Sequence, residues 1–190
     1  MKDIRIMKDI IIHAAMEEIR MRGLRFTMQD LATRLKVSKR SLYENFSSKE
    51  NLIDEMVDII LSDMTEEEHA IFARDIPIPE KVEALLTIHP YDAEMFNTNV
   101  YEDLKRMYPQ QWQKIENSRL ERQRHVEVLL TQGIEEGTLR PFQVSLIGHI
   151  LKDAFESFTS YSFLAGNGLT YEKAMHNLLD ILFKGMLRKR

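Results

Sequence analysis

Apolar residues recur along the chain at intervals of three and four, the spacing that gives a helix one buried face. No alternation of apolar and polar residues persists long enough to predict a β-sheet. The pattern therefore predicts an all-α protein of about nine helices. We place these helices at about residues 4–22, 27–35, 38–46, 49–74, 80–88, 92–107, 109–136, 141–164 and 170–187.

Residues that commonly begin or end helices stand between these segments. Thr27 followed by Asp30, and Ser47 followed by Glu50, have the spacing of a capping box, in which two side chains bond each other's backbone N–H groups. Gly137 follows the seventh segment, at the place where a left-handed residue commonly closes a helix. These signals agree with the boundaries that the apolar spacing predicts.

The stretch "LKVSKRSLYENF" interrupts the apolar spacing for only a few residues. Two short helices joined by a tight turn, and braced by a preceding helix, predict a helix-turn-helix whose second helix enters the major groove of DNA. Hydroxyl and basic side chains gather at the start of that second helix, where the helix dipole favours phosphate. These residues are Ser38, Lys39, Arg40 and Ser41.

Further polar side chains of this segment predict additional DNA contacts. Leu42 and Phe46 stand four residues apart and should face the core, which turns Tyr43 and Asn45 outward. The Tyr43 hydroxyl and the Lys49 ammonium are then placed to meet phosphates. A purely structural interpretation stays open, in which the hydroxyls cap helices and the basic side chains are solvated charge.

The charge of the chain is distributed unevenly along its length. Residues 1–50 contain 11 Lys and Arg against 7 Asp and Glu, whereas the remaining residues contain 15 against 23. A basic N-terminal part on an acidic body is typical of a small nucleic-acid-binding domain joined to a larger module, although chance scatter of surface charge is the alternative. We therefore predict a DNA-binding domain over residues 1–50 and a helical body over residues 51–190.

The segment "FTMQDLATRLKVSKRSLYENFSSKENLI" resembles the DNA-binding signature of the TetR family of transcriptional regulators, and the resemblance covers about residues 5–65. The shared features are the threonine that opens the second helix, the Val-Ser turn, a Leu-Tyr-x-x-Phe motif and a Ser-Lys-Glu entry to the fourth helix. They correspond to Thr27, Val37, Ser38, Leu42, Tyr43, Phe46, Ser48, Lys49 and Glu50.

The resemblance also implies which side chains meet DNA. Five fall at positions that face the groove, namely Gln29, Lys39, Arg40, Ser41 and Asn45. Four fall at positions that contact the DNA backbone, namely Thr27, Ser38, Tyr43 and Lys49. One position departs from the family, because Lys36 stands where a glycine usually precedes the valine of the turn. We therefore expect a lysine in the left-handed conformation at this turn.

By the same resemblance, the protein is expected to be a bacterial, dimeric regulator. Its fold would be an N-terminal three-helix helix-turn-helix domain followed by a C-terminal helical domain for ligand binding and dimerisation. A two-fold dimer presents two recognition helices to two half-sites, so double-stranded operator DNA would be read as a (pseudo)palindrome. The expected activity is repression that ends when a small, largely apolar effector binds.

The inner faces of the fourth to eighth helices carry candidate effector-lining residues, and the same side chains fit an ordinary protein core. They are Ile60, Met64, Leu85, Phe96, Val100, Leu104, Trp112, Val126 and Phe155. Methionine and aromatic side chains suit an adaptable apolar cavity. Arg119, Arg122 or His125 would hold a polar end of the effector if they face inward.

The last two predicted helices carry apolar stripes that are wider than one buried face requires. This width predicts a dimer interface of four helices, two from each subunit, as the family resemblance also implies. The residues that we expect at the interface are Ile147, Leu151, Phe158, Leu178 and Leu182. The alternative is that the additional apolar width packs inside a single subunit.

Other classes of function find less support in the sequence. The six histidines lack metal-binding spacing, and the chain has neither a P-loop, a nucleophile elbow nor a dinucleotide fingerprint, so we expect no enzyme. Because there is no cysteine, thiolate zinc sites are excluded, and we expect no cofactor or metal. A helical adaptor that binds only protein remains the alternative, but it leaves the basic N-terminal cluster unexplained.

The expected location is the cytoplasm. No apolar run reaches the roughly 20 residues that a membrane-spanning helix needs. The first segment also carries acidic residues among its apolar ones, unlike a signal peptide.

Overall fold

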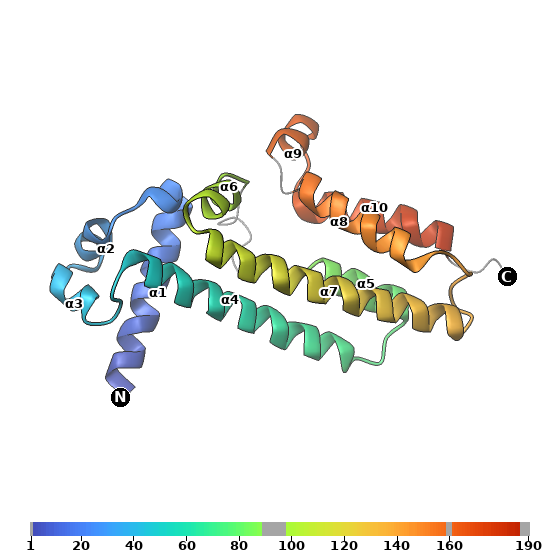
Figure 1. The fold of residues 1–190 in the computed structure, drawn as a ribbon, viewed down its shortest axis with the longest axis horizontal. Coiled ribbons are helices and arrows are strands. Elements are labelled where there is room, and N and C mark those ends of the chain that lie inside the picture. Colours follow the sequence, from blue (N-terminus) through green and yellow to red (C-terminus); the bar gives the residue numbers. More distant parts are fainter. Residues whose placement is uncertain (1, 89–97, 159–160, 187–190) are drawn as a thin grey trace. The chain divides into compact units, whose positions relative to one another are not determined.

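The computed structural model describes residues 2–88, 98–158 and 161–186, and the elements within these ranges are helices (Figure 1). The all-α prediction is confirmed. The elements are α1 (Lys2–Arg22), the 3-10 turn η1 (Gly23–Arg25), α2 (Met28–Leu35), α3 (Lys39–Tyr43), α4 (Lys49–Phe72), α5 (Ile78–Leu86), α6 (Thr98–Met107), α7 (Pro109–Glu135), α8 (Val144–Phe158), α9 (Tyr161–Asn167) and α10 (Tyr171–Met186). Within the described ranges, none of these helices is long and apolar enough to cross a membrane.

The chain divides into two compact units. The head unit comprises residues 1–62 and 90–115, and the body unit comprises residues 63–89 and 116–190. The predicted boundary after residue 50 falls inside the head unit, because Leu52, Ile53 and Met56 of α4 belong to its core. The assignment of DNA binding to residues 1–50 and of ligand binding to the remainder stays a prediction.

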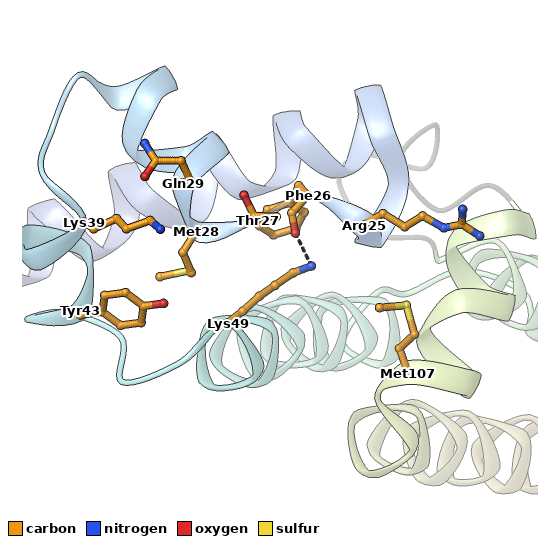
Figure 2. A pocket seen from close by; sticks show the side chains of 9 residues that line it. All are labelled: Arg25, Phe26, Thr27, Met28, Gln29, Lys39, Tyr43, Lys49 and Met107. Atoms are coloured by element: carbon orange, nitrogen blue, oxygen red, sulfur yellow. Dashed lines mark hydrogen bonds between the residues drawn. The ribbon is translucent and has the colours of Figure 1, made fainter.

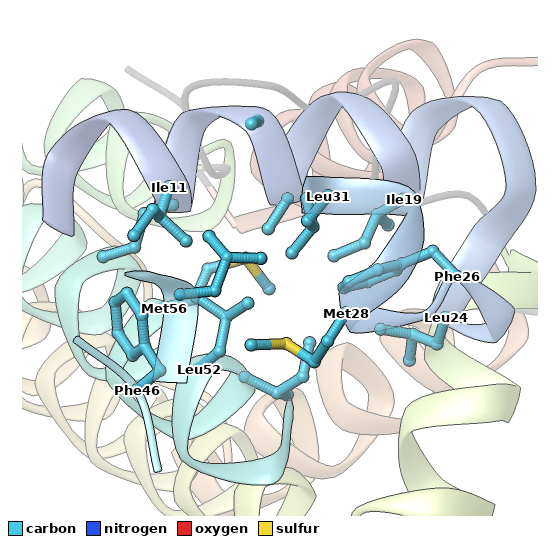
Figure 3. Close-up of a cluster of buried hydrophobic side chains, with 14 of the residues drawn as sticks. Ile11, Ile19, Leu24, Phe26, Met28, Leu31, Phe46, Leu52 and Met56 are labelled. Carbon is cyan, nitrogen blue, oxygen red and sulfur yellow. The ribbon is translucent and has the colours of Figure 1, made fainter. Parts of the chain in front are cut away.

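A single hydrophobic core holds the head unit together (Figure 3). Ile11 and Ile19 of α1 face Leu31 of α2, and Phe46 and Leu52 complete the cluster. All five side chains are almost completely buried. Burial of side chains of this size stabilises the folded state by about 1.5–3 kcal/mol each. The core therefore fixes α2 and α3 against α1 and α4.

Helix α6 also contributes to the core of the head unit, although it is distant in sequence. Val100 and Leu104 of α6 and the following Tyr108 are buried in the same cluster as Leu24 and Phe26. Desolvation raises the pKa of the Tyr108 hydroxyl above its ordinary value. The residues between η1 and α2 thus share a core with α6.

The turn between α2 and α3 has the left-handed lysine that the sequence predicts. Lys36 has φ 55° and ψ 38°. Its N–H donates to the Thr33 carbonyl at 3.3 Å, and the Val37 N–H donates to the Ala32 carbonyl at 3.0 Å. These two bonds form a Schellman motif, which usually places glycine at the left-handed position.

We expect Lys36→Gly to leave the melting temperature unchanged or to raise it. A non-glycine residue in this conformation costs about 1 kcal/mol, which offsets the greater backbone entropy that glycine loses on folding. Lys152→Gly, inside α8, serves as the control and should lower the stability by about 1 kcal/mol. Thermal unfolding followed by circular dichroism measures both, and a clear loss for Lys36→Gly alone would contradict this account of the turn.

A second core holds the body unit, with Leu85 of α5, Val126 and Leu130 of α7, Leu151 of α8 and Leu179 of α10 at its centre. Helix α7 ends as predicted, with Gly137 in the left-handed conformation at φ 73°. Leu139 comes two residues after this turn, and its side chain is buried. The backbone N–H of Leu139 donates to the Gly133 carbonyl at 2.9 Å.

The single helix predicted over residues 141–164 is wrong in two respects. Helix α8 begins only at Val144, because Leu139 is held back against α7 and the Arg140 Nε donates to the Gly185 carbonyl at 2.6 Å. The segment also contains two helices, α8 and the shorter α9, and residues 159–160 between them lie outside the described residues.

Candidate nucleic-acid interface

Helices α2 and α3 form a helix-turn-helix within the head unit. Thr27 caps α2, since its Oγ1 accepts from the Asp30 N–H at 3.2 Å while the Thr27 N–H donates to the Asp30 carboxylate at 2.7 Å. Ser38 caps α3, and its Oγ accepts from the Ser41 N–H at 3.1 Å. Both capping hydroxyls therefore have structural roles, as the alternative interpretation of the sequence expects.

The hydrogen bonds at the start of α2 also affect its charge. The bonds from the Thr27 hydroxyl and N–H lower the pKa of the Asp30 carboxyl below its ordinary value, and the nearby Arg22 adds to the effect. Asp30 is therefore an anion throughout the neutral range. The Asp30 carboxylate accepts from the Thr27 N–H and the Thr27 hydroxyl accepts from the Asp30 N–H, so two N–H groups at the start of α2 are satisfied within the chain.

Helix α3 is shorter than predicted and ends at Tyr43 instead of Phe46. The Phe46 N–H still bonds the Leu42 carbonyl at 2.9 Å, and the Asn45 Nδ2 donates to the Ser41 carbonyl at 2.9 Å. The Asn45 side chain, which we predicted to face the groove, is thus half-buried and turned back onto its own helix. Leu42 and Phe46 are buried as predicted, and Tyr43 is exposed.

A pocket of about 610 Å³ opens beside α3 on the head unit (Figure 2). Its walls come from the turn before α2, the first residues of α2, helix α3, the start of α4 and the end of α6. The lining residues are Arg25, Phe26, Thr27, Met28, Gln29, Lys39, Tyr43, Lys49 and Met107. Polar and cationic groups thus surround an apolar floor, which is a chemistry that suits a sugar-phosphate backbone.

Lys49 has a structural role that the sequence did not reveal. Its Nζ donates to the backbone carbonyls of Leu24 and Phe26 and lies 4.1 Å from the centroid of the Phe26 ring (Figure 2). Burial lowers the pKa of the Lys49 ammonium below its ordinary value. We predicted that Lys49 meets a phosphate, but these contacts use it to fasten the turn before α2 to the start of α4.

The structure brings five of the nine predicted DNA contacts to this pocket and leaves four outside its lining. The lining includes Thr27, Gln29, Lys39, Tyr43 and Lys49. The other four are Ser38, Arg40, Ser41 and Asn45. Among these, Arg40 is exposed, and its Nε bonds the Glu44 carboxylate one turn later at 3.1 Å.

Four lining residues escaped the sequence analysis, namely Arg25, Phe26, Met28 and Met107. Phe26 and Met28 flank the predicted contact Thr27. Arg25 is an exposed cation two residues before the cap of α2, and Met107 ends α6. Arg25 is basic and close to Thr27 in sequence, which could have identified it. Nothing in the sequence indicates Met107, because its place depends on the packing of α6 against η1.

The predicted effector-lining residues separate into the two cores. Four belong to the head core or pack against it: Ile60, Val100, Leu104 and Trp112. Three belong to the body core or pack against it: Met64, Leu85 and Val126. The ring of Phe155 lies 6.0 Å from the ring of Tyr171 in the body unit, and Phe96 lies outside the described residues. Their role in effector binding stays a prediction.

The predicted dimer residues all pack within a single chain. Leu151 is part of the body core, and the other four, Ile147, Phe158, Leu178 and Leu182, pack against it. Gly148 of α8 lies against α7, where a Cβ would meet the Glu127 carboxylate. Larger exposed apolar side chains on α8 and α10 are Leu146 and Ile181, with 55% and 69% of their surface exposed.

The chain resembles known regulators in sequence. The model of the family described as bacterial regulatory proteins, tetR family, matches residues 11–56. The uncharacterized HTH-type transcriptional regulator YvaF of Bacillus subtilis is 26% identical over 169 residues, which cover 88% of this chain and 89% of that protein.

Solved structures share the fold over almost the whole chain. The TetR family transcriptional regulator PfmR from Thermus thermophilus has a TM-score of 0.70 at 21% identity, covering 94% of this chain and 99% of its own. A protein from Saccharomonospora viridis, solved in complex with choline, has a TM-score of 0.79 at 14% identity, covering 96% and 98%. These likenesses confirm the predicted fold with its N-terminal helix-turn-helix.

Proposed function

The chain belongs to the TetR family of transcriptional regulators, and we propose that it is a homodimeric repressor that leaves its operator when a small effector binds. DNA binding by the helix-turn-helix follows from the family. The dimer, the repression and the effector are the parts that we propose. The alternative, an adaptor that binds only protein, would not need the basic pocket beside α3.

The pocket in the head unit is the observation that best supports this function. Arg25 and Lys39 are exposed cations that line it, and Tyr43, which carries a hydroxyl, is an exposed residue of the same lining. Phosphates of DNA are bound by such basic and hydroxyl groups, which position a protein on the duplex without reading its sequence. We propose that one stretch of the operator backbone lies across this pocket.

We propose that the operator sequence is read mainly by Arg40, which lies outside the pocket lining. Arg40 is exposed near the start of α3, and arginine commonly pairs with two acceptors of guanine in the major groove. The Glu44 carboxylate orients the Arg40 guanidinium from one side. We therefore propose Arg40 as the principal base contact and Lys39 as a contact to base or phosphate.

These two roles predict different losses for two arginine variants. Arg25→Gln should weaken binding to operator and to random DNA by a similar factor and lower the slope of log K against log salt by about 1. Arg40→Ala should cost about 1–3 kcal/mol on the operator and less on random DNA. The operator is first obtained by sequencing genomic fragments that the purified protein selects, and mobility shifts at several salt concentrations then measure both affinities.

Arg74→Gln is the matched control, because Arg74 is an exposed arginine of the body unit. It should bind both DNAs like the parent protein. If Arg40→Ala loses the same factor of affinity for operator and for random DNA, Arg40 is a phosphate contact. Failure of the parent protein to select or shift any DNA fragment would instead support the adaptor.

The dimer that we propose uses the outer faces of α8 and α10. Leu146 and Ile181 are large apolar residues that the body core leaves exposed. A two-fold interface repeats each residue of the patch, so the same two side chains would be covered in both subunits. Leu178 and Leu182, which we predicted at the interface, are partly buried against the body core, and their place in the interface stays a prediction.

The effector is proposed to bind in the body unit. The structural relative solved with choline supports a small molecule in this fold. An effector can release DNA only by its greater affinity for a state that binds DNA poorly. By reciprocity, operator DNA must then weaken effector binding by the same factor.

A further inference from the structure

Two arginines of α7 face the interior of the body unit. Only 10% of the Arg119 side chain and 12% of the Arg122 side chain are exposed. The spacing of three and four residues places both on the same face of the helix as the fully buried Val126. A guanidinium keeps its charge in any protein environment, so two permanent cations are enclosed here.

Protein carboxylates satisfy part of this charge. The Arg122 Nε donates to the Glu68 carboxylate at 2.5 Å, and the second oxygen of Glu68 lies 3.2 Å from the His125 Nδ1. Arg119 donates from Nη2 to Glu116 at 2.8 Å. Each oxygen of the buried Glu68 therefore has a partner on α7.

Each arginine nevertheless retains a buried nitrogen without an acceptor. Within the described residues, the Arg119 Nε and the Arg122 Nη2 have no hydrogen-bond partner. A buried N–H group without an acceptor is unfavourable, and more so when it carries charge. Arg119 and Arg122 stand three residues apart on one face of α7, and an acceptor from a ligand would satisfy these nitrogens.

An aromatic ring lies beside Arg119, and a second aromatic pair involves His125, the other partner of Glu68. The Arg119 guanidinium lies 4.8 Å from the centroid of the Phe155 ring, which contacts Tyr171 edge to face at 6.0 Å. The ring of His125 contacts Phe72 in the same manner at 5.4 Å. A ligand that reaches the two arginines would therefore place the rest of its surface against apolar side chains.

We propose that Arg119 and Arg122 bind the carboxylate of an effector with an apolar body. This inference rests on the proposed effector function and adds the chemical class of the molecule. Hydrogen bonds from arginine to a carboxylate are short and strong because both groups are charged. The exposed Glu156 carboxylate lies 3.9 Å from Arg119.

Three probes of equal chain length test the class of the head group. Decanoate, decanol and decyltrimethylammonium are titrated into the full-length protein by isothermal calorimetry. Decanoate should bind, decanol should bind at least about tenfold more weakly because it lacks the charge-assisted bonds, and the ammonium should bind least. Equal affinities for decanoate and decanol, tighter binding of the ammonium, or no binding of decanoate at millimolar concentration would each overturn the proposal.

Variants then test the two arginines. Arg119→Gln and Arg122→Gln should each weaken decanoate about tenfold or more and leave decanol unchanged. Arg124→Gln, an exposed arginine on the same helix, is the control and should bind decanoate like the parent. Arg122→Gln removes the main partner of the buried Glu68 and can therefore destabilise the chain. Its decanoate affinity is interpreted only if the variant keeps the melting temperature of the parent. If Arg122→Gln is destabilised, Arg119→Gln is the deciding variant, because its partner Glu116 is partly exposed. Unchanged decanoate binding by Arg119→Gln would overturn the proposal.

A mobility shift with decanoate separates this inference from the proposed function. If decanoate binds through the arginines but leaves the affinity for DNA unchanged, the carboxylate ligand class is supported and the proposed effector role of this site is contradicted. If another class of molecule releases DNA while decanoate does not bind, the proposed function stands and the carboxylate inference is overturned.

Discussion

The double variant Leu146→Glu, Ile181→Glu should be a monomer that binds its operator about 10²- to 10⁴-fold more weakly than the parent. Both side chains are large, apolar and exposed on α8 and α10, and a two-fold interface would place four like charges in one buried patch. A monomer reads each half-site alone and loses the effective concentration that links the two binding events. Sedimentation gives the oligomeric state, and a mobility shift gives the affinity.

The control for this experiment is Val128→Glu, since Val128 is an exposed apolar residue of α7. This variant should sediment and bind DNA like the parent protein. Charges at Leu178 and Leu182 would be a poorer test, because these residues pack against the body core and the chain would be destabilised. A dimer that survives the double substitution would place the interface elsewhere.

Phe46→Ala should destabilise the head unit by about 3–5 kcal/mol and remove DNA binding with it. The Phe46 ring is completely buried in the head core, and a truncation of this size leaves a cavity that the neighbours fill only in part. Unfolding in urea, followed by circular dichroism, measures the loss of stability. A mobility shift at a temperature where the variant is unfolded measures the loss of function.

Tyr43→Phe is the matched control three residues earlier, because Tyr43 is exposed and lines the pocket. Removal of its hydroxyl should leave the urea midpoint unchanged and weaken DNA binding by the roughly 0.5–1.5 kcal/mol of one hydrogen bond. If both variants lose stability to the same extent, the Tyr43 side chain belongs to the fold rather than to the interface.

Local signals predicted the helix-turn-helix well because they act over a few residues. The Thr27 and Asp30 capping box and the left-handed Lys36 are both present. The predicted Ser47 and Glu50 capping box is wrong, since the Ser48 hydroxyl accepts from the Asn51 N–H and the Asn51 side chain accepts from the Ser47 N–H. Two adjacent serines offer the same chemistry, and the sequence cannot distinguish them.

Contacts between distant segments could not be predicted in the same way. Lys49 follows the family motif, but its bonds to Leu24 and Phe26 depend on how η1 packs against α4. Likewise, an apolar stripe shows which face of a helix is covered but not by which chain. For this reason Leu178 and Leu182, which are partly buried against the body core of their own chain, stay predicted interface residues.

The discontinuous core of the head unit limits how this protein can be recombined with its relatives. A chimaera that joined only residues 1–62 to a foreign body would lack Val100, Leu104 and Tyr108, which cover Leu24 and Phe26. The transferable module is therefore residues 1–62 together with 90–115. An exchange of the body unit between such regulators, by engineering or by evolution, must therefore keep α6 with the head unit.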